Sequence, residues 1–378
     1  MIELRTARNE KEADRAYELA AGLFGPDYEE SLSHKQLTRS LEPLEDLRDV
    51  VILADDQKIL GLIRIINRHC SSPVGQLKVG GITSVCIHSD LQGQGWGTIL
   101  MEGARQRSLE RKDDFSLLFS RRVITGWYSK IGYLGIGCKS EIRLDQLNGA
   151  RQQASALIET HTGVDCSYLG VYSDAFTASY SGLPLTFNRI WHWWNELEYR
   201  LSQHHVEPEN FINVMAAETP IGYFIKSNDH VIEAAALDEF RAEFLTGMLN
   251  HCRSAGEDTI TVTLPSGHWC MTDLPGHTNR EPTPNLTWNH SQMVRVLNKD
   301  PFREIALKSC SPEEFTATQN LFDRADIESH EGARQMLSAV VGQDPVFPPG
   351  GYEDLPVSPT EGQRLLPSLP YWALLDEI

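Results

Sequence analysis

Hydrophobic and polar residues in the first 145 positions follow a pattern that is typical of an α/β unit. Apolar residues recur at every second position in some short segments, as in strands, and with helical spacing in others. The predicted strands are at 2–5, 49–54, 59–66, 82–87 and 115–120, with a strand pair within 133–144; the predicted helices are at 9–23, 125–131 and from the turn after 87 to about 112. Asn9 can cap the first helix, and residues 55–58 form the expected hairpin turn.

A similar pattern returns between residues 150 and 300. It predicts strands at 211–217, 221–226, 231–236 and 259–264, with a helix at 239–252. From residue 301 onward, helices near 312–323 and 331–341 precede a tail whose seven prolines at 342–370 prevent regular structure. The chain is therefore expected to divide into a first unit (1–145), a second unit (150–300) and a C-terminal extension (301–378).

A glycine-rich turn joins the strand at 82–87 to the helix that follows. Gly93, Gly95 and Gly97 let the backbone approach an anion closely, and the N–H groups that open the helix have no partners within it. These N–H groups lie at the positive end of the helix dipole, so the turn is suited to a pyrophosphate. A P-loop would need Gly-Lys-Ser/Thr and a dinucleotide fingerprint would need G-x-G-x-x-G; neither pattern is present. A glycine turn without a ligand is the remaining alternative.

The pattern Gln92-x-x-Gly95-x-Gly97 resembles the acyl-coenzyme A signature of the GNAT N-acetyltransferases, which is Arg or Gln, two residues, Gly, one residue, then Gly or Ala. The resemblance covers the first unit, and the order of elements in the second unit is similar. It implies an α/β protein with the GNAT fold, a mixed, mostly antiparallel sheet flanked by helices, duplicated in tandem and followed by a C-terminal extension. It also implies acetyl-coenzyme A as co-substrate, with the following binding residues: Val85, Cys86, Ile87, Gln92, Gly93, Gln94, Gly95, Trp96, Gly97 and Thr98.

The second unit lacks the glycine turn. Leu237, Asp238, Glu239 and Phe240 stand where that turn would be. Acidic side chains at a helix N-terminus would repel a pyrophosphate. We therefore expect this copy to be degenerate and unable to bind the cofactor.

The tandem arrangement is similar to that of the enhanced intracellular survival (Eis) type of acetyltransferase. The segments that carry this resemblance are Gly80-Gly81-Ile82-Thr83-Ser84-Val85 and Trp127-Tyr128-Ser129-Lys130-Ile131-Gly132-Tyr133. It implies that Tyr128 is the general acid that protonates the coenzyme A thiolate; packing in the core is the alternative for this ring. It further implies that the carboxylate of Ile378 is the general base. His88 and a water chain are the competing bases, since no Glu or Asp lies between Gly80 and Ser89.

Composition narrows the class of partner. The formal net charge of −18 argues against nucleic acid and is compatible with a polycationic amine, although solubility alone would also explain it. Seven scattered cysteines indicate a reducing, cytoplasmic setting, and the grouping of His268, Cys270 and His277 has no recognised metal spacing, so no metal is expected. No long apolar run predicts a membrane segment. Assembly into homo-oligomers is left open by the sequence.

Together these features predict a transferase: an acyl-coenzyme A-dependent N-acetyltransferase in which a primary amine of a small molecule or peptide attacks the thioester directly. The alternative from another class is a noncatalytic acyl-coenzyme A sensor or assembly module, which the missing glutamate base permits.

Overall fold

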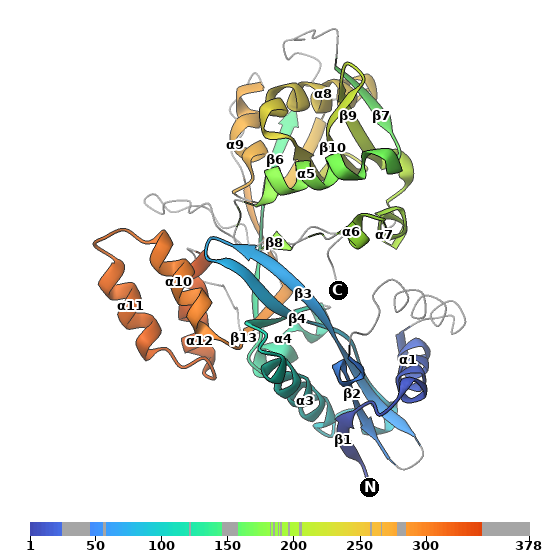
Figure 1. Ribbon diagram of the computed structural model, residues 1–378, viewed down its shortest axis with the longest axis vertical. Helices are drawn as coiled ribbons and strands as arrows, with labels where there is room; N and C mark the ends of the chain where they lie inside the picture. Colours follow the sequence, from blue (N-terminus) through green and yellow to red (C-terminus); the bar gives the residue numbers. More distant parts are fainter. Residues whose placement is uncertain are drawn as a thin grey trace.

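A computed structural model describes the chain except for residues 25–45, 56–57, 121, 146–157, 182, 184–185, 188, 190, 196, 204–205, 258, 266, 278–284 and 342–378. Two sheet-centred units lie one above the other, and strand β6 (Leu134–Asp145) runs between them (Figure 1). The described strands form one hydrogen-bonded path in the order β1-β2-β3-β4-β5-β13-β6-β12-β11-β10-β9-β7, with β8 attached to β3.

The first unit contains most of the elements expected from the sequence. Its strands are β1 (Glu3–Thr6), β2 (Val50–Ala54), β3 (Ile59–Ser72), β4 (Gly75–Ile87) and β5 (Phe115–Phe119), and its helices are α1 (Glu10–Phe24), α3 (Trp96–Arg111) and α4 (Arg122–Lys130). The pairing is antiparallel except between β4 and β5, which are parallel. Asn9 caps the start of α1 as predicted, because its Oδ1 accepts the backbone N–H of Glu12 at 3.0 Å.

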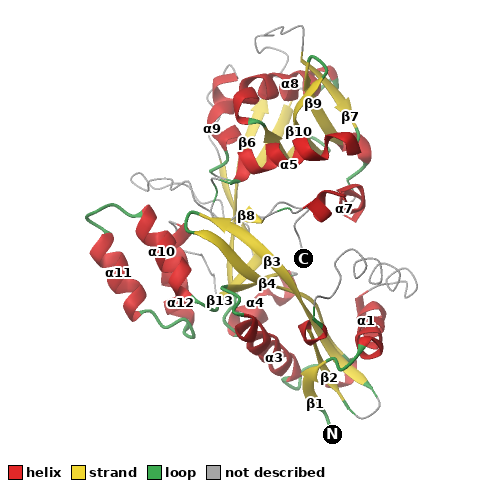
Figure 2. Cartoon of the chain, viewed as in Figure 1, coloured by secondary structure: helices red, strands yellow, loops and turns green. Residues whose placement is uncertain are grey.

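Successive residues of the first sheet point to opposite faces, as the strand period requires. Leu53, Ile63 and Ile82 pack with α3 and α4 in one hydrophobic cluster. Ile52 and Leu62 instead pack with α1 on the other face. Helices thus cover both faces of the sheet (Figure 2).

The second unit repeats this plan. Its strands are β7 (Ile158–Thr162), β9 (Phe211–Ala216), β10 (Thr219–Ser227), β11 (His230–Ala236) and β12 (Thr259–Leu264); its helices are α5 (Leu169–Tyr180), α6 (Trp191–Asn195), α7 (Leu197–Gln203), α8 (Arg241–Ser254) and α9 (Trp269–Asp273). A short strand, β8 (Thr186–Phe187), pairs with Cys70 and Ser71 of β3 and so contacts the first unit.

The units exchange strands at β6 and β13 (Asn285–Val296). The first half of β6 pairs with β13, whose end also pairs with β5, while residues 140–145 of β6 pair with β12 of the second unit. The strand pair expected within 133–144 is therefore wrong: this segment is one continuous strand. Its glycines, Gly135 and Gly137, do not form a turn, because a partner strand from far along the chain satisfies the backbone there.

The C-terminal extension begins with three helices, α10 (Lys299–Ser309), α11 (Phe315–Arg324) and α12 (His330–Val341). They cover the face of β4, β5, β6 and β13 that lies opposite α3 and α4, and Phe302, Phe322 and Met336 are fully buried against Val79 and Leu117. The extension is thus an integral layer of the first unit.

Candidate functional site

Strands β4 and β5 of the first unit separate part of the way along the sheet. They pair from Val79 to Ile82 on β4, and beyond Ile82 no pairing with β5 continues. At the point of separation the register of β4 against β3 shifts, and Ser84 has a φ of 55°. The result is a bulge that turns the end of β4 away from β5.

The end of β4 presents backbone groups to this gap. The N–H of His88 bonds the carbonyl of Leu60 at 2.8 Å, so His88 and Cys86 direct their backbone groups toward β3. Because these directions alternate along a strand, Val85 and Ile87 direct theirs to the side of the gap. Among the described side chains, the only recorded contact to either is from Gln92, whose amide Nε2 donates to the Ile87 carbonyl at 3.1 Å.

The glycine-rich turn adopts the conformation that its sequence requires. Gly93 and Gly95 have φ values of 75° and 86°, and Gly95 is the N-cap of α3 without a side-chain cap. A Cβ at either glycine would meet no protein atom within 4 Å, so the surface above the turn is open. The first turn of α3 contains no acidic residue. A phosphate could therefore accept from its N–H groups.

Other predicted binding residues serve the turn itself. Gln94 donates to the Asp90 carbonyl at 2.6 Å, and the N–H of Thr98 bonds the Gly95 carbonyl at 3.1 Å. His88 accepts the N–H of Asp90 through Nδ1 at 3.3 Å, so only its Nε2 is available to act as a base.

Tyr128 belongs to the same hydrophobic cluster as Trp96, the first residue of α3. Its neighbour Trp127 on α4 packs against α3 so closely that a Cβ at Gly97 would be 3.0 Å from the indole. The Tyr128 ring is 4.7 Å from that of Trp127 and 6.0 Å from that of Tyr133, between centroids. Burial raises the pKa of Tyr128 above its ordinary value of 10.0, so the phenol keeps its proton at neutral pH. Burial also raises the pKa of Tyr133 to about 12, and its hydroxyl is paired with Ser116 at 2.7 Å.

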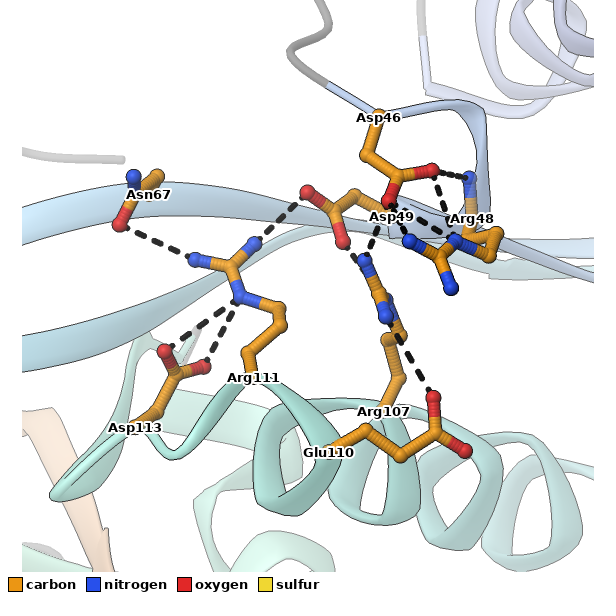
Figure 3. Close-up of polar contacts among 8 residues, drawn as sticks. All are labelled: Asp46, Arg48, Asp49, Asn67, Arg107, Glu110, Arg111 and Asp113. Atoms are coloured by element: carbon orange, nitrogen blue, oxygen red, sulfur yellow. Dashed lines mark hydrogen bonds and ion pairs between the residues drawn. The ribbon is translucent and has the colours of Figure 1, made fainter.

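The opposite end of α3 is fixed by ion pairs (Figure 3). Arg107 and Arg111 both contact Asp49, which precedes β2, at 2.8 Å, and Arg107 also contacts Asp46 at 2.9 Å. The side chains of Arg107, Arg111 and Asp49 are at least nine-tenths buried, so these pairs are stronger than surface pairs. They line a pocket of about 420 Å³, which lies roughly 20 Å from the glycine turn at the helical rise of 1.5 Å per residue. This pocket is therefore not the site described above.

The second unit has a gap in the same place. Strands β11 and β12 pair only at His230 and Val231 of β11, and the Leu237 N–H bonds the Ile221 carbonyl at 3.0 Å, as His88 does with Leu60. Ala234 and Ala236 thus occupy the positions of Val85 and Ile87.

Side chains of the second unit fill this gap. The Tyr180 hydroxyl accepts the N–H of Ala234 at 3.3 Å. The Ser179 hydroxyl accepts the N–H of Ala236 at 2.9 Å and that of the Trp269 indole at 3.0 Å, and it donates to the Ala236 carbonyl at 3.2 Å. We call Ser179, Tyr180 and Trp269 the plug. The backbone of β11 is thereby satisfied without a ligand.

The second unit also lacks the turn between strand and helix. Residues 238–240 form a 3-10 helix with two acidic residues, and α8 follows directly at Arg241. In the first unit, four residues, 92–95, separate the corresponding 3-10 helix from α3. Arg241 pairs with Asp238 at 2.5 Å and lies 5.0 Å from the Trp269 ring, covering the helix start.

Several predicted features fall elsewhere. Ile378 lies outside the described residues. His268 caps α9, since its Nδ1 accepts the Cys270 N–H at 3.2 Å. The described residues contain no cluster of three or more His, Cys, Asp or Glu suited to a metal ion, and no helix among them is long and apolar enough to cross a membrane. Sequence reasoning missed the plug, because Ser179 and Tyr180 lie on a helix that carried no recognised motif.

Comparison with known proteins identifies a domain family that the first unit matches. Residues 3–135 match the family model of the acetyltransferase (GNAT) domain. The match lies within the first unit and ends at the start of β6, so the first unit is the part of the chain that this domain model describes.

Solved structures share this tandem fold. A GCN5-related N-acetyltransferase from Kribbella flavida is 16% identical with a TM-score of 0.56, and the match covers 80% of this chain and 72% of that one. A probable N-acyltransferase from Enterococcus faecalis is 16% identical (TM-score 0.59; 80% and 75% covered), and Eis1 from Mycobacterium abscessus is 14% identical (0.57; 80% and 75%). At such identities the likeness shows the fold alone. No curated protein sequence matches the chain.

Proposed function

We propose that the chain is an acyl-coenzyme A-dependent N-acetyltransferase that transfers acetyl from acetyl-coenzyme A to a primary amine of a small molecule or peptide. The observation that carries this proposal is the β4–β5 gap, since Val85 and Ile87 at the gap share one hydrophobic cluster with Trp96 of the glycine turn and with the buried Tyr128. Both ends of a bound thioester then have protein groups suited to them.

The binding half of the proposal rests on backbone groups. The N–H groups at the start of α3 donate to the pyrophosphate oxygens, and Val85 and Ile87 bond the amides of the pantetheine arm as a partner strand would. The ring of Trp127 lies against Gly97 and closes one side of the turn.

The chemical step of the proposal requires an acid for the departing sulfur and a base for the amine. The amine nitrogen attacks the acetyl carbonyl carbon, so a C–N bond forms and the C–S bond breaks. The Tyr128 hydroxyl donates its proton toward the departing sulfur, where the negative charge develops. The amine loses one proton to a base before attack, which matters because an amine of pKa about 10.4 is almost fully protonated at pH 7. The nitrogen loses a second proton after the C–N bond has formed, and this proton restores the Tyr128 hydroxyl.

The base is proposed among three candidates: the terminal carboxylate of Ile378, His88 through Nε2, and a water chain. Deleting residues 376–378 removes the first, and adding two glycines after Ile378 displaces it. If Ile378 is the base, both changes lower turnover by about tenfold or more. Full activity in both variants would exclude Ile378 and leave His88 or water.

Substrate class and setting are further proposals. A net charge of −18 favours cationic amines over anionic ones, since it attracts them to the protein. The cysteines at 70, 86, 166, 252, 270 and 310 form no disulfide, which suits a reducing cytoplasm.

The alternative is a noncatalytic acyl-coenzyme A sensor. One experiment separates the two: release of coenzyme A is measured with acetyl-coenzyme A and a panel of amines that includes polyamines, aminosugars and peptides with free N-termini. Amine-dependent release supports the transferase. Tight binding in calorimetry without release for any amine would favour the sensor.

A further inference from the structure

The proposed transfer requires a fixed position of two helices relative to each other. These are α3, whose first turn is proposed to bind phosphate, and α4, which carries Tyr128. A single carboxylate links the supports of both. Glu328, between α11 and α12 of the C-terminal extension, accepts from Arg105 of α3 through Oε1 at 3.0 Å. Its Oε2 accepts from Arg295 of β13, also at 3.0 Å.

Arg295 continues the link to α4. Its Nη1 donates to the carbonyl of Ile131, just after the end of α4, at 2.9 Å. The N–H groups of Ile131 and Tyr133 both donate to the carbonyl of Tyr128 at 3.1 Å. The guanidinium of Arg295 is therefore two hydrogen bonds away from the backbone of Tyr128.

The local geometry makes this link specific. Gly132 has a φ of 90°, and a Cβ there would lie 3.3 Å from Nε of Arg295, so the guanidinium packs directly on the turn that ends α4. The side chains of Arg105 and Arg295 are 17% and 16% exposed, whereas that of Glu328 is 56% exposed. The two arginines are set in the fold, and the glutamate bridges them from the extension.

We propose that Glu328 and Arg295 are positioning residues for Tyr128, through which the C-terminal helices set the place of α4 relative to α3. This inference rests on the proposed function. An exposed ion pair contributes little to stability. The rate of a transfer, by contrast, is sensitive to small displacements of a proton donor. Loss of the bridge therefore changes turnover far more than it changes folding.

The test compares Glu328→Gln with Glu331→Gln in the full-length protein. Glu331 pairs with Arg334 at 2.9 Å and accepts from Gln335 at 2.8 Å, both within α12, so its substitution is a control for loss of an exposed carboxylate from the extension. We expect Glu328→Gln to lower kcat about tenfold, with unchanged KM and calorimetric Kd for acetyl-coenzyme A and an unchanged melting temperature. Glu331→Gln should keep wild-type kcat. Arg295→Lys should lose as much as Glu328→Gln, because one ammonium cannot reproduce the two-sided contact of the guanidinium.

A double-mutant cycle identifies the residue through which the bridge acts. In the Tyr128→Phe background, Glu328→Gln should cause no further loss, since the donor that it positions is gone. If the double variant lost activity by the product of the two single losses, the inference would be overturned. A rise in KM without a fall in kcat for Glu328→Gln would also overturn it, because the effect would then lie on α3. Failure of the proposed acid would be visible separately, as normal turnover in Tyr128→Phe alone.

Discussion

In the first unit β4 leaves β5 after Ile82, and in the second unit β11 leaves β12 after Val231, so the same opening occurs twice in one chain. The two openings differ in what meets the strand. Hydroxyls of Ser179 and Tyr180 satisfy β11, whereas the backbone of Val85 on β4 faces the gap and α3 begins without a side-chain cap. The fold therefore supplies a gap in any case, and the residues around it decide whether the gap is available to a ligand.

The comparison also shows which changes matter. Residues 92–95 have no counterpart before α8, which follows the 3-10 helix at 238–240 directly. The second unit lacks the turn and has the plug, and these two differences fit together. Backbone polar groups of β11 that meet no ligand must form hydrogen bonds with protein groups instead. Four experiments test this difference between the two units.

The largest effect is expected at Gly95. Gly95→Asp adds a carboxylate and a Cβ at a φ of 86°, where the phosphates are proposed to bind. Calorimetry should show a stoichiometry near one acetyl-coenzyme A per chain for the wild type and no binding for the variant. Gly95→Asn is the control, since Asn tolerates this backbone region without adding charge, and it should retain weak binding. A wild-type stoichiometry near two would mean that the second unit binds as well.

Tyr128→Phe should lower kcat by about a hundredfold while the Kd for acetyl-coenzyme A stays the same, because the ring remains and only the donor is lost. Tyr133→Phe is the matched control: it removes the hydrogen bond to Ser116 and should cost about 1 kcal/mol of unfolding free energy with little change in kcat. Since burial raises the pKa of Tyr128, its ionisation should produce no loss of activity below about pH 10. An alkaline decline near pH 8 that disappears in Tyr128→Phe would contradict this assignment.

Removal of the plug should affect stability and leave cofactor binding unchanged. Ser179→Ala leaves Ala236 and the Trp269 indole without their partner, at a cost of about 1–3 kcal/mol in unfolding free energy. Thr177→Ala on the exposed side of the same helix is the control and should be nearly neutral. Denaturant titration measures both variants. A second equivalent of acetyl-coenzyme A bound by Ser179→Ala would show that the plug alone had closed the second gap.

The smallest effect is a dependence of stability on pH. Burial lowers the pKa of His268, beside the plug, from 6.5 to about 3. Below pH 6.5 the unfolded chain binds a proton at this ring and the folded chain does not, so protonation favours the unfolded state. The contribution of His268 to the free energy of unfolding is therefore complete above pH 6.5 and is lost as the pH falls toward 3. The slope should approach about 1.4 kcal/mol per pH unit in that range. His268→Asn keeps a cap for α9 without a titrating ring and should remove this slope; an unchanged slope would assign it to other groups.

Local signals predicted the first unit well. The turn at 92–98 and the elements around it have the expected places, because glycine conformations, helix caps and strand alternation are encoded in neighbouring residues. The partner of β6 could not be predicted, because β13 lies about 150 residues further along the chain. The pattern of neighbouring residues does not indicate with which distant strand a segment pairs. The plug was missed for a similar reason: Ser179 and Trp269 meet only in the folded chain.

Strand β13 has a consequence for the order in which the molecule can assemble. The sheet of the first unit is incomplete until residues 285–296 lie between β5 and β6, so it cannot close while synthesis is still in the second unit. Until then β5 and β6 present unpaired edges, which are prone to join other chains. A fragment cut after residue 145 should for the same reason be insoluble or bound to chaperones. The first unit thus completes its folding only together with the second, although each unit has its own hydrophobic core.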